Sequence, residues 1–89
     1  MSIPEYRHVP QNIQNFVRRY FRFEHLKPDL QARSAPFAHL AANILAQCEF
    51  KASTDVVADA FIDWAEIMVG LRFLRQAKDC VVSAYVPEA

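Results

Sequence analysis

The chain has 89 residues, 53% of them hydrophobic, and its ten Lys and Arg balance ten Asp and Glu to a formal net charge of zero. This charge balance argues against a duplex DNA binder, which usually has a strongly basic domain. A chain this short forms one domain that hides only about 60 to 65% of its unfolded surface, and its apolar content exceeds the usual level of about 45 to 50%. We therefore expect a marginally stable domain that self-associates or presents a binding face.

Charge is unevenly distributed along the chain. Residues 1–47 hold six Lys and Arg against three Asp and Glu, and residues 48–89 hold four against seven. Such asymmetry suits either contact between basic and acidic faces of different subunits or a basic patch for an anionic ligand. No signal peptide, lipidation motif or apolar run of transmembrane length is present, so we expect a soluble cytoplasmic protein without membrane contact.

The N-terminal segment and the first helix differ in pattern. Residues 1–10 contain two prolines and no hydrophobic period, which predicts an extended or loose arm. Over residues 11–23 apolar side chains recur at helical spacing, while three arginines lie mostly on the other side. The apolar set is Ile13, Phe16, Val17, Tyr20 and Phe21. The pattern predicts an amphipathic helix over 11–23.

A second helix is predicted over residues 29–48. Lys27 is pushed out of the helical region by Pro28, and Pro28 suits a first helical turn. Ser34 can cap a new helix with Pro36 in its first turn, or Pro36 can kink one continuous helix, and the sequence leaves both open.

Because the two cysteines, Cys48 and Cys80, would lie about 36 Å apart along the next helix, an intrachain disulfide is excluded.

The longest hydrophobic pattern predicts a helix over residues 54–86, with Ser53 or Thr54 as its N-cap. Its heptad seam follows alternating steps of three and four and is broken by a single lysine, Lys78. A helix of this length would span about 46 Å in a chain whose compact radius of gyration is about 12 Å, so either Gly70 bends it or other subunits cover it. We therefore expect an all-α helical hairpin with an added N-terminal helix, assembled as a homo-oligomeric bundle. The predicted oligomer interface comprises Val57, Trp64, Ile67, Leu71, Leu74, Val81 and Tyr85.

Signs of catalysis and of metal binding are few. Gly70 is the sole glycine, so no glycine-rich phosphate loop or nucleophile elbow exists. His8, His25 and His39 lack metal-type pairing. We expect a protein that is not an enzyme and that holds no metal or cofactor.

Two basic clusters are candidates for binding an anion. Phe23, His25 and Lys27 follow the first helix, where a ring can stack on a base and a cation can reach a phosphate. Arg72, Arg75 and Lys78 follow one ridge of the last helix. In both cases the alternative is that the basic side chains bind no ligand and form the solvated face of a helix whose other face packs in the core. Lys78 is different because it lies on the seam. There its partly buried ammonium group needs an anion, an acidic residue or water as a partner.

Two sequence blocks resemble a group of small phage and prophage proteins. The segments "FRFEHLKPDLQARSAPFAHLAANI" and "VGLRFLRQAKDCVVSAY" carry the likeness. The first block is matched by Phe21, His25, Leu26, Leu30, Gln31, Ser34, Pro36, Phe37, Leu40 and Ala41. The second is matched by Leu71, Arg72, Leu74, Ala77, Lys78, Asp79 and Val82.

These proteins are similar, more loosely, to the phage family that sequesters cyclic oligonucleotide signals of bacterial CBASS immunity. The resemblance implies an anti-defence protein of helical protomers that binds a cyclic di- or trinucleotide between protomers by aromatic stacking and basic residues. Phe23 stands where the stacking ring of that family would fall. The ligand-binding residues implied are Arg22, Phe23, His25, Lys27, Arg33, Arg72, Arg75 and Lys78.

An alternative interpretation is an anti-CRISPR-type protein that blocks a host defence complex by direct contact. Four acidic residues would then mimic the phosphates of a nucleic acid, although carboxylates are also common at a solvated helix N-terminus. They are Asp55, Asp59, Asp63 and Glu66. A helix bundle with a purely structural role is the third alternative.

Overall fold

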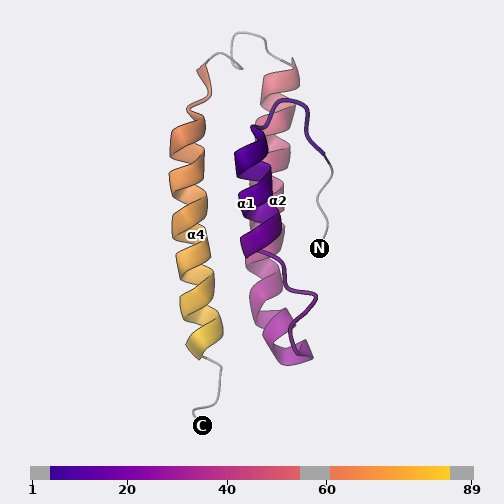
Figure 1. The fold of residues 1–89 in the computed structure, drawn as a ribbon, viewed down its shortest axis with the longest axis vertical. Coiled ribbons are helices and arrows are strands. Elements are labelled where there is room, and N and C mark those ends of the chain that lie inside the picture. The colour runs from indigo at the N-terminus through magenta and orange to yellow at the C-terminus, as the bar shows by residue number, and fades with distance from the viewer. Residues whose placement is uncertain (1–4, 55–60, 85–89) are drawn as a thin grey trace.

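The computed structural model describes residues 5–54 and 61–84, which form three helices and no strand. The helices are α1 (Gln11–Tyr20), α2 (Pro28–Thr54) and α4 (Trp64–Ala84). Figure 1 shows them side by side, with α1 and α4 running in one direction and α2 in the other. The molecule is elongated, with extents of 52 × 21 × 17 Å. The predicted all-α class is confirmed.

Helix α1 ends earlier than its hydrophobic pattern predicts. The backbone N–H groups of Ile13 and Gln14 donate to the carbonyl of Pro10, and the last helical residue is Tyr20. Phe21 follows as the C-cap, its N–H bonded to the Val17 carbonyl, and its side chain is fully buried. The predicted end at residue 23 is therefore wrong by three residues, because Phe21 leaves the helix to fill the core.

Helix α2 is one continuous helix that passes through Pro36. Ser34 is buried inside this helix, so it is not an N-cap, and the alternative of one helix through the proline is correct. The helix also extends six residues beyond the predicted end at 48. The hydroxyls of Ser53 and Thr54 donate to the Phe50 carbonyl at 3.1 and 2.7 Å and so satisfy the last turn of α2 rather than beginning the next helix.

The prediction of one helix over 54–86 is wrong in its first part, because Ile62 and Asp63 are not helical and α4 begins at Trp64. Asp63 caps this start: its Oδ1 accepts the backbone N–H of Glu66 at 3.2 Å. An aspartate at this position is compatible with the heptad pattern both as an N-cap and as a residue inside a longer helix. The sequence pattern therefore does not reveal where the helix begins. The helix then continues through Gly70.

Of the predicted interface and acidic residues, Val57, Tyr85, Asp55 and Asp59 lie outside the described part of the chain.

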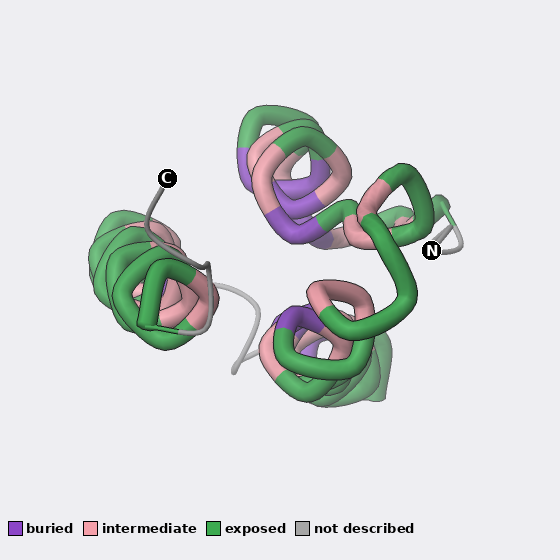
Figure 2. The backbone as a smooth tube through the Cα atoms, turned by 90° about the horizontal axis from the view of Figure 1, so that it is seen from below, coloured by how far each residue is buried: buried purple, intermediate pink, exposed green. Residues whose placement is uncertain are grey.

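The hydrophobic core runs along the axis between the three helices. Figure 2 shows the buried positions of the helices turned toward one another, with α4 exposed over most of its outer surface. The core residues are Val9, Ile13, Val17, Phe21, Ala38, Ala41, Leu45 and Leu71. Leu71, expected at an oligomer interface, is thus buried within its own chain, and Trp64, Ile67 and Leu74 pack against the same core. The described seam therefore joins α4 to α1 and α2, and of the predicted interface residues in the described part of the chain only Val81 is exposed, at 38%.

The N-terminal arm is fixed to the helices from Tyr6 onward. The buried side chain of Gln14 accepts the Tyr6 N–H at 3.1 Å and donates to the carbonyls of Tyr6 and Val9 at 2.9 and 2.8 Å. The Glu49 carboxylate accepts the N–H groups of His8 and Val9 at 2.7 and 3.4 Å and pairs with the His8 ring. Residues 7–9 form a bend, so this part of the arm is neither loose nor fully extended.

The contact between Glu49 and the arm predicts a loss of stability in acid. Burial alone would raise the pKa of Glu49, but the His8 backbone N–H, the His8 side chain and the Val9 N–H outweigh it, so the pKa lies below its ordinary value. A depressed carboxyl pKa contributes stability that is complete above the unfolded pKa of about 4.3 and is lost as pH falls through the folded pKa.

We therefore expect Glu49→Gln to reduce the free energy of unfolding by about 1 to 2 kcal/mol at pH 7, because the partly exposed charged hydrogen bonds are replaced by weaker ones. The difference between variant and parent should shrink below about pH 4, where the parent loses the same charge. Urea titrations at pH 7 and pH 3 measure this. An equal difference at both pH values would contradict the assigned role of the carboxylate.

Candidate anion-binding site

A basic pocket of about 360 Å³ lies where the end of α1, the start of α2 and the last third of α4 meet. The side chains that line it come from all three helices and from the loop after α1. They are Arg19, Tyr20, Arg22, His25, Leu26, Ser34, Arg75, Lys78, Asp79, Val82 and Ser83. We refer to this set as the basic pocket.

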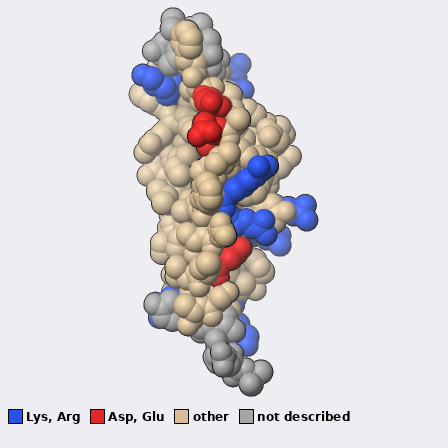
Figure 3. Space-filling model, turned by 90° about the vertical axis from the view of Figure 1, so that its left-hand side faces the viewer, with Lys and Arg blue, Asp and Glu red and all other residues tan. Residues whose placement is uncertain are grey.

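Positive charge dominates the basic pocket. Four permanent cations face one carboxylate, Asp79, which gives a net charge of +3 before His25 is counted. In the whole chain the charges cancel, so this local excess comes from folding, which brings the basic end of α1 beside α4. Figure 3 shows one group of blue side chains on a flank of the molecule, midway along its length, with red close below it. A concave surface of one sign raises the local concentration of an oppositely charged ligand.

Lys78 is the most enclosed cation of the pocket. Its side chain is 14% exposed, and its Nζ donates to the carbonyl of Tyr20 at 2.6 Å and lies 3.2 Å from Asp79 Oδ1. The Tyr20 carbonyl belongs to the last turn of α1, whose unpaired carbonyls attract a cation. The seam lysine therefore caps α1 from α4, which explains a charged residue at that heptad position.

Tyr20 and Arg75 form a stacked pair at the wall of the pocket. The Arg75 guanidinium lies 3.7 Å from the centroid of the Tyr20 ring, and the Arg19 guanidinium lies 5.3 Å from it. Arg75 Nε is also 3.7 Å from Asp79 Oδ2, one helical turn away. Because stacking uses the flat face of the guanidinium, its N–H groups stay directed around the rim, where they can bind a phosphate oxygen.

The structure brings together half of the predicted ligand residues. Arg22, His25, Arg75 and Lys78 line the basic pocket. The other four are Phe23, Lys27, Arg33 and Arg72, which lie outside its lining.

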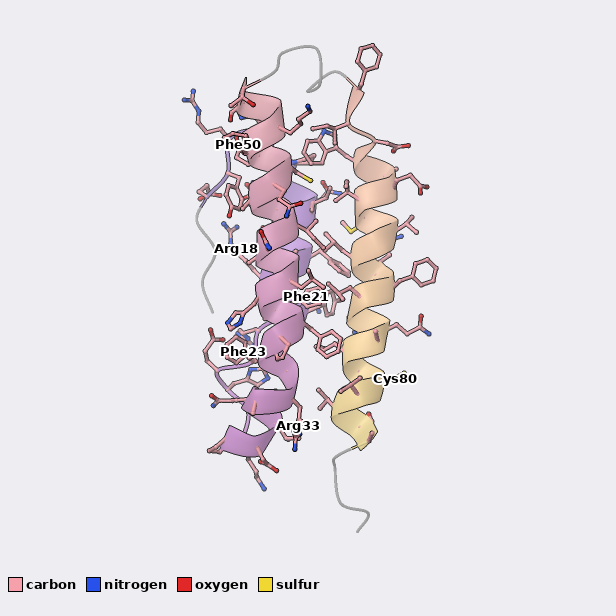
Figure 4. The ribbon with its side chains drawn as sticks, turned by 180° about the vertical axis from the view of Figure 1, so that it is seen from behind. Arg18, Phe21, Phe23, Arg33, Phe50 and Cys80 are labelled. Carbon is pink, nitrogen blue, oxygen red and sulfur yellow. The ribbon has the colours of Figure 1, made fainter. Side chains whose placement is uncertain are left out.

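These four residues lie at other places in the structure. The Phe23 ring packs edge-on against His39 at 5.8 Å, so it does not serve as the predicted stacking platform in this arrangement. Arg72 lies one turn before Arg75 but faces a separate groove beside Asn12 and Trp64. Lys27 and Arg33 are exposed at the lower end of the molecule, where Figure 4 labels Arg33 and Phe23.

Sequence reasoning missed Arg19 and Tyr20. The residue spacing places Tyr20 on the apolar stripe of the first helix and Arg19 on its solvated face. A signal was present, because Arg19 and Arg22 are three residues apart and flank the helix end, but the partner side chains come from α4. Their distance along the chain, from Arg22 to Arg75, kept the cluster from being recognised.

The acidic residues of the alternative interpretation are separate from this pocket. The Asp63 carboxylate is occupied as the cap of α4, and Glu66 is exposed one turn later. Within residues 5–54 and 61–84, no three His, Cys, Asp or Glu side chains come together in a way that could hold a metal ion. No described helix combines the length and apolar character needed to cross a membrane.

Comparison of the chain with protein-family models, curated proteins and solved structures found no match.

Proposed function

We propose that this protein binds an anionic cyclic oligonucleotide in the basic pocket and thereby sequesters it. The observation that carries the proposal is the convergence of Arg19, Arg22, Arg75 and Lys78 on one cavity in a chain of zero net charge. The likeness of two sequence blocks to phage proteins supports an origin in a phage and a role against a bacterial defence signal. Residues of one chain line this pocket, whereas the resemblance implies a ligand held between protomers.

The pocket offers the two interactions that a nucleotide needs. One arginine guanidinium can donate hydrogen bonds to two phosphate oxygens at once, and each charged hydrogen bond contributes about 1.5 to 3 kcal/mol. The Tyr20 ring is already covered by the Arg75 guanidinium, which lies 3.7 Å from its centroid, so a base would stack on the plane of that guanidinium rather than on the ring itself. A volume of about 360 Å³ is at the small end of ligand pockets. One nucleotide unit would enter, and the rest of a cyclic ligand would remain at the rim.

The test is the affinity of the purified protein and two arginine variants for a panel of cyclic di- and trinucleotides, measured by isothermal titration calorimetry. We expect at least one ligand to bind and Arg75→Ala to weaken it about 10- to 150-fold, the equivalent of one charged hydrogen bond. Binding should also weaken as salt is raised, because the attraction is between charges.

The matched control is Arg72→Ala. It removes the same side chain one turn earlier on α4, outside the basic pocket, so affinity should stay within about twofold of the parent. Lys78→Met is not diagnostic, because losing the cap of α1 lowers stability as well. A panel without binding, or equal losses for Arg72→Ala and Arg75→Ala, would contradict the proposal. Stoichiometric capture of one host protein would then favour the alternative of a protein-blocking module.

A further inference from the structure

Ser34 is the most deeply buried residue that lines the basic pocket. It is 1% exposed, whereas Arg22 and Asp79 of the same lining are exposed. Ser34 lies near the start of α2, and Figure 1 shows this part of α2 at the same end of the molecule as the last turns of α4. The pocket therefore has a charged rim and a floor to which α2 contributes a hydroxyl.

The Ser34 hydroxyl makes no hydrogen bond within residues 5–54 and 61–84. A hydroxyl inside a helix often donates to the carbonyl four residues before it, as Thr54 does to Phe50 at 2.7 Å. In the same part of the chain, no side-chain oxygen or nitrogen that is closed off from solvent lacks a partner. The small exposed part of Ser34 therefore includes its Oγ, which is open to the basic pocket.

The other groups beside this hydroxyl are apolar or already bonded. Leu26 and Val82 are half-buried and line the pocket. The Lys78 ammonium already bonds to the last turn of α1 and to Asp79. A phosphate at the floor would lose its hydration in exchange for one neutral hydroxyl, which is unfavourable. A nucleobase is neutral, its faces suit apolar walls, and its edge carries hydrogen-bonding groups.

We propose that one base of the ligand enters the basic pocket and that the Ser34 hydroxyl binds the edge of this base, while the phosphates stay with the guanidinium groups at the rim. The inference rests on the proposed function, because it assigns the parts of the same ligand to the floor and the rim. A hydroxyl both donates and accepts, so Ser34 can bind a carbonyl, a ring nitrogen or an amino group of a base. One polar group in an apolar recess fixes the orientation of what enters it.

The test compares inorganic phosphate with the 5′-monophosphates of adenosine, guanosine, cytidine and uridine, titrated into the protein and followed by NMR chemical shifts. We expect at least one monophosphate to bind more tightly than inorganic phosphate. Ser34→Ala should weaken that monophosphate about 2- to 12-fold, the equivalent of one neutral hydrogen bond, and leave inorganic phosphate within about twofold of the parent. Arg75→Ala should weaken both, because it removes a cation of the rim.

The thermal stability of Ser34→Ala separates a role in binding from a role in folding. Alanine is a better helix former than serine, and the lost hydroxyl makes no bond within the described chain, so the variant should melt no lower than the parent. Ser53→Ala is the matched control, since Ser53 is on the same helix but outside the pocket and bonds to the Phe50 carbonyl. It should bind every monophosphate as the parent does.

The outcomes distinguish this inference from the proposed function. If Ser34→Ala binds every monophosphate like the parent while Arg75→Ala loses affinity, no base is bound at Ser34 and the proposed function stands. If Ser34→Ala weakens inorganic phosphate as much as the monophosphates, a phosphate occupies the floor, which also overturns the inference. A parent that binds neither these probes nor any cyclic nucleotide would overturn the proposed function, and the inference with it.

Discussion

Replacement of Phe21 by alanine is expected to reduce the free energy of unfolding by about 3 to 5 kcal/mol. The ring is fully buried where the three helices meet, in contact range of Phe16 at 6.3 Å between centroids and below Lys78 at 5.8 Å. Figure 4 shows it between α2 and α4. Because domains of this size are stable by only about 5 to 15 kcal/mol, the variant should melt at least 10 °C lower or be partly unfolded.

Phe50→Ala is the matched control for Phe21→Ala. Phe50 is 70% exposed near the end of α2, so its removal leaves no cavity and should change stability by no more than about 0.5 kcal/mol. Phe21→Leu, which keeps most of the volume, should fall between the two. Thermal melts followed by circular dichroism give the comparison. Equal melting temperatures for Phe21→Ala and Phe50→Ala would mean that Phe21 is not at the centre of the core.

Replacement of Gln14 by alanine is expected to reduce the free energy of unfolding by about 2 to 4 kcal/mol. Its side chain satisfies the Tyr6 N–H and the carbonyls of Tyr6 and Val9, and each buried backbone group left without a partner costs about 1 to 3 kcal/mol. The expected loss is smaller than the sum of the costs for three unpaired backbone groups, because Tyr6 is only partly buried and its backbone groups can bind water. Chemical denaturation provides the measurement, and the arm should become accessible to protease in the variant.

Gln11→Ala is the control for Gln14→Ala on the same helix. Gln11 is exposed and bonded to Asn15 alone in the described contacts, so its loss should change stability by no more than about 0.5 kcal/mol. If both variants are equally stable, the arm is not held by Gln14. If only Gln14→Ala is destabilised but the arm resists protease, Glu49 alone holds it.

Local patterns in the sequence predicted much of the fold. The apolar period of α1, the start of α2 and the apolar stripe of α4 follow from residue spacing, which fixes helical faces without reference to the rest of the chain. The helix boundaries were predicted less accurately, because Phe21, the pair Ser53 and Thr54, and Asp63 each suit two different positions in a helix. The contacts of each side chain decide which position it takes. Phe21 packs in the core, and the other three bond to backbone groups of the last or first turn of a helix.

The candidate site was predictable only in part, since Arg22, His25, Arg75 and Lys78 were identified as basic residues without a reason for them to meet. The sequence by itself determined that this protein is helical, with apolar faces enough for a core and a charge bias between its halves. The tertiary structure alone decided that the end of α1 rests against the last third of α4. That contact, made by Lys78 on the Tyr20 carbonyl and by Arg75 on the Tyr20 ring, joins residues more than fifty positions apart. Spacing within one helix carries no information about such contacts, because they arise from packing between helices.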